Sequence, residues 1–268
     1  MQDLTITLIQ SDLVWENKTA NLNNFQNKIA DIKENTDLII LPEMFTTGFS
    51  MNPKDFAEEE NGITLAWMKT RAKEKNAFLA GSFIVLENGL FFNRLFLVSP
   101  RGDYQTYNKR HLFRMAGEDN FYSMGQDSLI ANINGWKINF LICYDLRFPV
   151  WAKNTYSKGV YQYDILLTVA SWPEVRNIIW TTLLAARAIE NQAFAIGVNR
   201  VGFDANRFHH TGDSNICDAK GNPLFHEKAG IEFTKTISLK FDELKLLRDK
   251  INVGLDWDLF QIENKINL

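Results

Sequence analysis

The chain has 268 residues, of which 46% are hydrophobic and 23% are charged, and this balance fits a single α/β domain over residues 1–268. The net charge of -3 and the pI near 5.9 give no electrostatic reason to expect nucleic acid or an anionic membrane as a partner. We therefore expect a protein that acts on small molecules.

The predicted elements alternate between short β-branched or aromatic runs and stretches of helical period, which is typical of a layered α/β fold. From the N-terminus, the pattern predicts a strand at residues 4–10, a helix at 19–32, a strand at 38–41, a helix at 65–75, strands at 78–85, 91–98, 104–107, 136–142 and 165–169, a helix at 175–190 and a strand at 194–198. Several strands lack polar alternation, so we expect them to be buried on both faces.

Turn signals and the last helix indicate how these elements are arranged. The Asn-Gly pairs within residues 87–89 and 134–135 are typical of tight hairpins, so the adjacent strands should run antiparallel and the sheets should be mixed. The helix at 175–190 is apolar around much of its circumference, which predicts a buried helix that also faces a partner subunit. Residues 251–268 show no clear period, and we expect a C-terminal arm there that packs on another surface.

The first residues and the cysteine count bear on the compartment. The chain begins MQDLTITLIQ, without a cationic n-region, and no apolar run approaches the ~20 residues of a membrane span. The two cysteines, Cys143 and Cys217, are far apart and form neither a Cys-x-x-Cys pair nor a dense disulfide pattern. We therefore expect a cytoplasmic protein with two free thiols.

Three apolar strands each run directly into one titratable residue. Glu43 follows the strand at 38–41, Lys109 follows that at 104–107, and Cys143 follows that at 136–142. Loops leave the core at the C-terminal ends of the strands in an α/β sheet and open a crevice, so ligands and catalytic groups collect there. The three side chains are therefore expected to converge.

These residue types suit acyl transfer through a thiol. Cys143 needs a neighbouring base or cation, because a free thiol has a pKa of about 8.5. Glu43 would take the thiol proton, deliver it to the departing amine and then activate water. Lys109 would stabilise the oxyanion together with a backbone N–H such as that of Tyr144. The alternatives are a buried hydrophobe at Cys143, a solvated carboxylate at Glu43 and an exposed basic turn at Lys109.

The sequences around these residues resemble the three signature segments of the nitrilase superfamily, in the expected order. They read Leu41-Pro-Glu43-Met-Phe, Tyr107-Asn-Lys109-Arg-His-Leu-Phe and Cys143-Tyr-Asp-Leu-Arg147-Phe-Pro. The resemblance implies an αββα sandwich of mixed sheets covered by helices on their outer faces, a homodimer, and a Glu-Lys-Cys triad. It also implies that Glu118 holds Lys109 and the attacking water in place; the alternative is a surface acid.

The residues after the nucleophile indicate the omega-amidase branch, because Cys143-Tyr-Asp-Leu-Arg-Phe differs from the Cys-Trp-Glu of nitrilases proper. The resemblance implies hydrolysis of 2-oxoglutaramate or 2-oxosuccinamate, through a thioester, to the acid and ammonia. Arg147 is the expected partner of the substrate carboxylate, since a guanidinium binds a carboxylate bidentately; the alternative is an ion pair with Asp145. The expected pocket walls, which also fit a plain core, are Phe113, Tyr144, Ser171 and Trp172.

Other chemistries fit the sequence less well. His111 is the one histidine near the triad residues along the chain, and we expect it to point away from Lys109. His209 and His210 lack the i, i+4 spacing of a helical zinc site, and glycine-rich cofactor motifs are missing, so we predict no metal and no cofactor. Two other functions stay open: an amidase or carbamoylase for another small carbon–nitrogen substrate, and a catalytically silent dimeric binding protein of the same fold.

Overall fold

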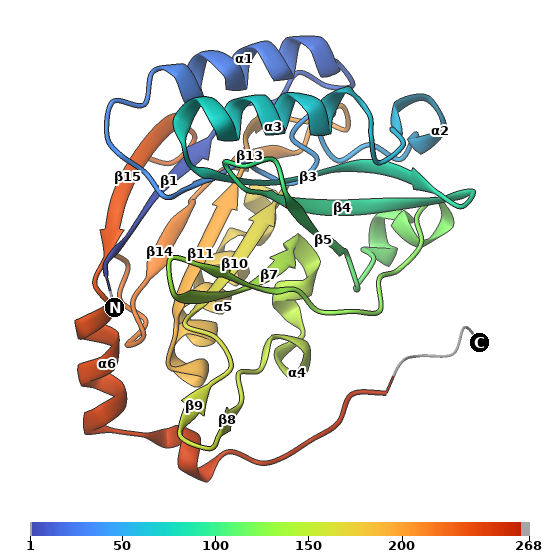
Figure 1. The fold of residues 1–268 in the computed structure, drawn as a ribbon. Coiled ribbons are helices and arrows are strands. Elements are labelled where there is room, and N and C mark those ends of the chain that lie inside the picture. Colours follow the sequence, from blue (N-terminus) through green and yellow to red (C-terminus); the bar gives the residue numbers. More distant parts are fainter. Residues whose placement is uncertain (1, 264–268) are drawn as a thin grey trace.

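Two mixed β-sheets stack face to face in the computed structural model, which describes residues 2–263 (Figure 1). The first sheet has the order β15 (Phe233–Leu239), β1 (Leu4–Gln10), β2 (Leu38–Ile40), β3 (Phe78–Glu87), β4 (Leu90–Val98) and β5 (Tyr104–Asn108). The second has the order β14 (Asn215–Cys217), β11 (Phe194–Asn199), β10 (Ile165–Ala170), β7 (Trp136–Ile142) and β6 (Ile130–Ile133). Three neighbouring strands of each sheet are parallel, and the others join antiparallel.

Helices cover the outer face of each sheet. The helices α1 (Lys18–Ala30) and α3 (Ile63–Lys75) lie on the first sheet, while α5 (Asn177–Asn191) packs against the second (Figure 1). The layers therefore follow the order αββα, which confirms the predicted sandwich. Shorter elements join these layers: α2 (Pro53–Phe56), α4 (Pro149–Ala152), α6 (Phe241–Lys250), β8 (Tyr156–Ser157), β9 (Val160–Tyr161), β12 (Val201–Phe203) and β13 (His209–Thr211).

Alternating side chains of the central strands enter two different cores. In β2, Leu38 and Ile40 pack between the sheets, whereas Ile39 packs under the helices. In β7, Phe140 belongs to the core between the sheets and Leu141 to a cluster on the opposite face. Both faces of such a strand are buried, and this explains why the sequence shows no polar alternation there.

Every predicted strand is present, with ends within two residues of those expected. The two Asn-Gly turns also form as predicted: Asn88 and Asn134 adopt positive φ values of 51°, each followed by a glycine with positive φ. The prediction missed β15 and α6, among other elements. The strand β15 pairs with β1, at the other end of the described chain, and such a distant partner leaves no local pattern.

The helix predicted at 175–190, which we expected to be buried and also to face a partner subunit, is buried on one side only in the single chain. In α5, Trp180 and Leu184 are buried, but Ile178 is 75% and Ile189 53% exposed. Among residues 2–263, no helix has both the length and the apolar character needed to cross a membrane. Of the predicted arm, residues 264–268 lie outside the described part, and Trp257 packs edge-on against Tyr161.

The close contact between α5 and β11 depends on Gly197. A Cβ there would lie 2.5 Å from Trp180 Cζ2 and 2.6 Å from Leu184 Cδ1, and both side chains are buried. We expect Gly197→Ala to destabilise the fold by about 1–3 kcal/mol and to lower the thermal midpoint by several degrees. Thr181→Ala, on the exposed face of α5, should change stability by less than about 0.5 kcal/mol. Equal midpoints for the two variants would contradict this packing.

Candidate active site

The C-terminal ends of β2, β5, β7 and β10 meet at one edge of the sandwich, and each is followed by a residue of the site. Lys109 Nζ lies 2.9 Å from Glu43 Oε1. The backbone N–H of Ser171, after β10, donates to Glu43 Oε2 at 2.9 Å, and Cys143 Sγ lies 3.9 Å from the Ser171 carbonyl oxygen. The three residues predicted from strand ends are thus brought together, with Ser171 bridging the two sheets.

Glu43 is a buried carboxylate that accepts hydrogen bonds on both oxygens. Besides Lys109 and Ser171, the side-chain amide of Asn93 donates to Oε1 at 2.8 Å. Glu43 is 0% exposed and Lys109 1%, so the alternatives of a solvated carboxylate and an exposed basic turn are wrong. Asn93 lies in the middle of β4, where no sequence signal marked it.

A second buried carboxylate, Glu118, holds Lys109 from the other side. Lys109 Nζ donates to both oxygens of Glu118, at 3.0 and 2.9 Å, and the backbone N–H of Phe113 donates to Oε2. Glu118 is 0% exposed, which rules out the surface acid. Burial opposes the charge on Lys109, but Glu118 and Glu43 together raise its pKa, so the ammonium stays charged. Burial raises the pKa of Glu118, and Lys109 opposes this shift.

Cys143 begins a sharp turn that leaves β7. Its φ is +46°, a left-handed value that is uncommon for residues other than glycine. The Asp145 carboxylate holds the turn: it accepts hydrogen bonds from the Ile142 N–H at 3.0 Å, the Tyr107 hydroxyl at 2.8 Å and the His111 N–H at 2.9 Å. Tyr107 belongs to β5, so the turn that carries the thiol is anchored to the strand that leads to the lysine.

The electrostatic surroundings favour the protonated thiol at rest. Burial raises the pKa of Cys143 well above its ordinary value, the Glu43 carboxylate raises it further, and the Lys109 ammonium opposes both. A protonated thiol beside a hydrogen-bonded carboxylate is a proton donor next to its acceptor. The arrangement can therefore generate a thiolate by local proton transfer to Glu43.

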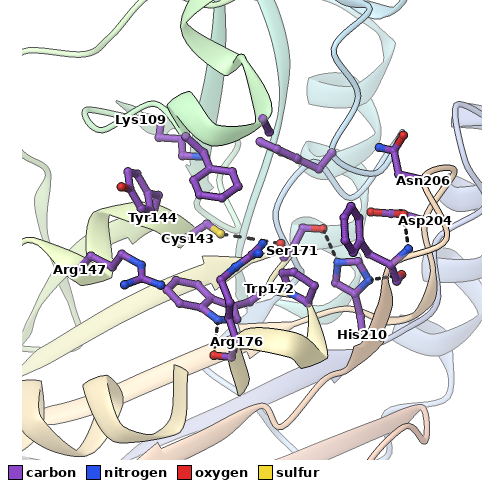
Figure 2. A pocket seen from close by; sticks show the side chains of 15 residues that line it. Lys109, Cys143, Tyr144, Arg147, Ser171, Trp172, Arg176, Asp204, Asn206 and His210 are labelled. Atoms are coloured by element: carbon purple, nitrogen blue, oxygen red, sulfur yellow. Dashed lines mark hydrogen bonds between the residues drawn. The ribbon is translucent and has the colours of Figure 1, made fainter. Parts of the chain in front are cut away.

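A cavity of about 90 Å³ opens beside Cys143 (Figure 2). All five predicted pocket residues line it: Phe113, Tyr144, Arg147, Ser171 and Trp172. The predicted alternative of an ion pair between Arg147 and Asp145 is wrong, since the Asp145 oxygens bind Tyr107, His111 and the backbone.

Four polar residues that the sequence analysis missed also line this cavity: Arg176, Asp204, Asn206 and His210. Arg176 ends a 3-10 turn (Glu174–Arg176) before α5, in a segment that was predicted to be helical. The others come from the β12–β13 hairpin, which the pattern did not predict. Figure 2 shows Asp204, Asn206 and His210 across Ser171 from Arg147.

His111, the one histidine near the triad residues along the chain, does not line the cavity. His111 stacks on Phe148 and binds Asp145, whereas His210 lines the cavity with its Nε2 3.5 Å from Ser171 Oγ. Burial and the Arg200 charge lower the pKa of His210 to about 3, so its imidazole is neutral near pH 7. Among residues 2–263, no hydrogen bond joins His210 to Cys143, and no group of three or more His, Cys, Asp or Glu side chains is placed to hold a metal ion.

The chain resembles a known family, known proteins and solved structures. A family model described as carbon-nitrogen hydrolase matches residues 5–242. The chain is 40% identical to Omega-amidase YafV of Escherichia coli (strain K12), over 98% of this chain and 100% of that protein. It is 32% identical to 2-oxoglutaramate amidase of Bacillus subtilis, over 82% of this chain and 85% of that protein. The crystal structure of XC1258 from Xanthomonas campestris, a CN-hydrolase superfamily protein, matches with a TM-score of 0.95 at 38% identity, over 98% of this chain and 100% of that one.

The sign of the coupling between Glu43 and Cys143 can be measured. The Glu43 charge raises the pKa of Cys143, so Glu43→Gln should lower it, and the alkylation rate of the thiol should rise at a lower pH than in the parent protein. Both proteins should carry Cys217→Ala, because Cys217 is a second free thiol. Glu59→Gln, at an exposed position, is the matched control. If the pH midpoint of the alkylation rate in Glu43→Gln is unchanged or higher than in the parent protein, the Glu43 charge does not raise the pKa of Cys143.

Proposed function

This chain belongs to the carbon–nitrogen hydrolase family, in the omega-amidase branch of the nitrilase superfamily, and we propose that it converts 2-oxoglutaramate and 2-oxosuccinamate to the dicarboxylic acid and ammonia. The chain is a cysteine-dependent amidase and so acts on carbon–nitrogen bonds other than peptide bonds. One observation carries the choice of substrate: the cavity beside Cys143 is lined by Arg147, a cation suited to a distal carboxylate.

We propose that the reaction proceeds through a thioester. Glu43 takes the proton from Cys143 as Sγ attacks the amide carbon, and the oxyanion is stabilised by Lys109 and the backbone N–H of Tyr144. Glu43 then gives the proton to the nitrogen, the carbon–nitrogen bond breaks, and ammonia leaves. Water attacks the thioester, its proton passes through Glu43, and the acid and the thiol are released. Glu118 acts by holding Lys109, so its role is one of positioning.

The contacts in the cavity support this assignment of the substrate. The guanidinium of Arg147 lies over the ring of Trp172, 5.3 Å from its centroid, and over that of Tyr144 at 5.9 Å. The ring of Phe113 lies edge-on to Tyr144, with centroids 5.0 Å apart. Aromatic walls of this kind exclude water and hold a short chain between the thiol and the cation.

Ammonia release from short dicarboxylate monoamides is the expected activity of the purified protein. Cys143→Ala and Glu43→Gln should each lower it by more than about a thousandfold, because the nucleophile and the base act as one unit. Cys217→Ala is the control and should retain it. With wild-type protein, added hydroxylamine should divert the thioester to a hydroxamate.

Several outcomes would contradict the proposal. Release of carbon dioxide with ammonia from carbamoyl compounds alone would identify a carbamoylase. Turnover of other amides, without turnover of the dicarboxylate monoamides, would assign another substrate class. Absence of any amide hydrolysis would favour a silent binding protein, and activity that survives in Cys143→Ala would remove the thiol from the mechanism.

We also propose that the protein forms a homodimer and acts in the cytoplasm. The exposed apolar residues Ile178 and Ile189 on α5 support association with a second copy. Light scattering should give twice the mass of the chain, and a monomeric mass at micromolar concentration would contradict the dimer. The two free cysteines support a reducing compartment, and fractionation that places the protein outside the cytoplasm would contradict this location.

A further inference from the structure

Two guanidinium groups in the cavity, those of Arg147 and Arg176, have no carboxylate partner among residues 2–263. Four other arginines with little exposed side-chain surface each bind a carboxylate: Arg94 binds Glu87, Arg187 binds Glu190, Arg200 binds Asp12 and Arg248 binds Asp164. The two cavity arginines instead lie over aromatic rings; Arg176 is 5.2 Å from the centroid of Phe113, and Arg147 lies over Trp172 and Tyr144.

The two cations repel each other at partly buried positions. Burial lowers the pKa of Arg176, and the Arg147 charge acts in the same direction, whereas a thiolate at Cys143 would oppose it. Removing a guanidinium from water without an anionic partner is unfavourable, and a second guanidinium nearby adds to the cost. A carboxylate bound between them removes both penalties, so the pair forms an anion site in the cavity of the nucleophile.

We propose that Arg147 and Arg176 act together as a charge filter for monoamides that have a carboxylate at the far end. The two arginines admit monoamides in which carbon 2, next to this carboxylate, has an oxo group or no substituent. They reject monoamides in which carbon 2 has an ammonium group. A 2-oxo oxygen can accept a hydrogen bond from a guanidinium, whereas an ammonium beside the bound carboxylate brings a third cation and only donors. Glutamine and asparagine are thereby disfavoured. This inference rests on the proposed function and deepens it.

The opposite wall of the cavity provides an alternative binding site for the far end of the substrate. Asp204 is the carboxylate among the described lining residues, and Figure 2 shows it on the far side of Ser171 from Arg147. One of its oxygens accepts a hydrogen bond from the Phe208 N–H at 2.9 Å, within its own loop. A substrate that points its far end toward Asp204 would find an acceptor for an ammonium there. If the far end of the substrate lies at the arginines, variants of Arg176 should alter binding; if it lies at Asp204, variants of Asp204 should do so.

Glutaramate and glutamine form the matched probe pair, because they differ only in the ammonium group. Their affinities for the Cys143→Ala protein, measured by calorimetry, should differ by about tenfold or more in favour of glutaramate, as expected for like charges at short range in a partly buried site. Adding Arg176→Met should weaken glutaramate binding and reduce that ratio at least severalfold, whereas Arg176→Lys should preserve most of it. Arg101→Met, in the exposed turn between β4 and β5, is the control for loss of one positive charge.

The same variants in the active protein test the filter during turnover. The ratio of kcat/KM for 2-oxoglutaramate to that for glutamine should fall in Arg176→Met, mainly through KM, and should stay high in Arg176→Lys. Thermal unfolding midpoints close to that of the parent protein establish that each variant is folded. If Arg176→Met is not folded, Arg176→Gln takes its place. The filter is overturned if the ratios are unchanged in Arg176→Met, or if Asp204→Asn, and not the arginine variant, alters glutamine binding.

Failure of the proposed function gives a different result. If wild-type protein hydrolyses no dicarboxylate monoamide, the function is wrong, but binding of glutaramate and glutamine to Cys143→Ala still measures the filter. If the monoamides are hydrolysed and the binding ratio does not depend on Arg176, the function stands and the filter is wrong.

Discussion

The buried ammonium of Lys109, held between the carboxylates of Glu43 and Glu118, is the interaction on which the site depends. All three side chains are almost completely removed from solvent. Breaking such a group by removing one partner typically costs about 3–5 kcal/mol, because an unpaired charge is left behind. The group also has an architectural effect: Glu43 and Lys109 follow strands of the first sheet, while the Ser171 N–H that binds Glu43 follows a strand of the second. The contact between the sheets therefore places Glu43 next to the thiol of Cys143.

Proton transfer at this site needs a carboxylate that is stabilised but still able to accept a proton. Glu43 receives hydrogen bonds from Lys109, Asn93 and Ser171, which fix the positions of both its oxygens. Cys143 lies in a buried setting that disfavours the thiolate. In the proposed reaction, the thiol is protonated at rest and becomes a nucleophile as its proton moves to Glu43. Asp145 maintains the geometry, since it fixes the turn of Cys143 against β5.

The charges in the cavity are separated in space. Glu43 and Lys109 bind each other, whereas the guanidinium groups of the two arginines lie over aromatic rings and bind no carboxylate within residues 2–263. His210, whose pKa is lowered to about 3, adds no charge near neutral pH. The charges at the reacting centre bind one another, whereas the two arginines can take an added anion, and this matches a substrate with a neutral amide at one end and an anion at the other.

The sequence by itself determined the central strands, the hairpin turns and the residues Glu43, Lys109 and Cys143. These features are local: a buried strand is an apolar run, a tight turn needs Asn-Gly, and a residue that follows a strand lies at the strand end. The tertiary structure alone decided that Asn93 binds Glu43, that His210 reaches the cavity in place of His111, and that Arg176 lies in the same cavity as Arg147. Those contacts join segments distant in the chain, and their energies depend on burial and on the approach of the two sheets. The sequence pattern shows neither the burial of these side chains nor the distance between the two sheets.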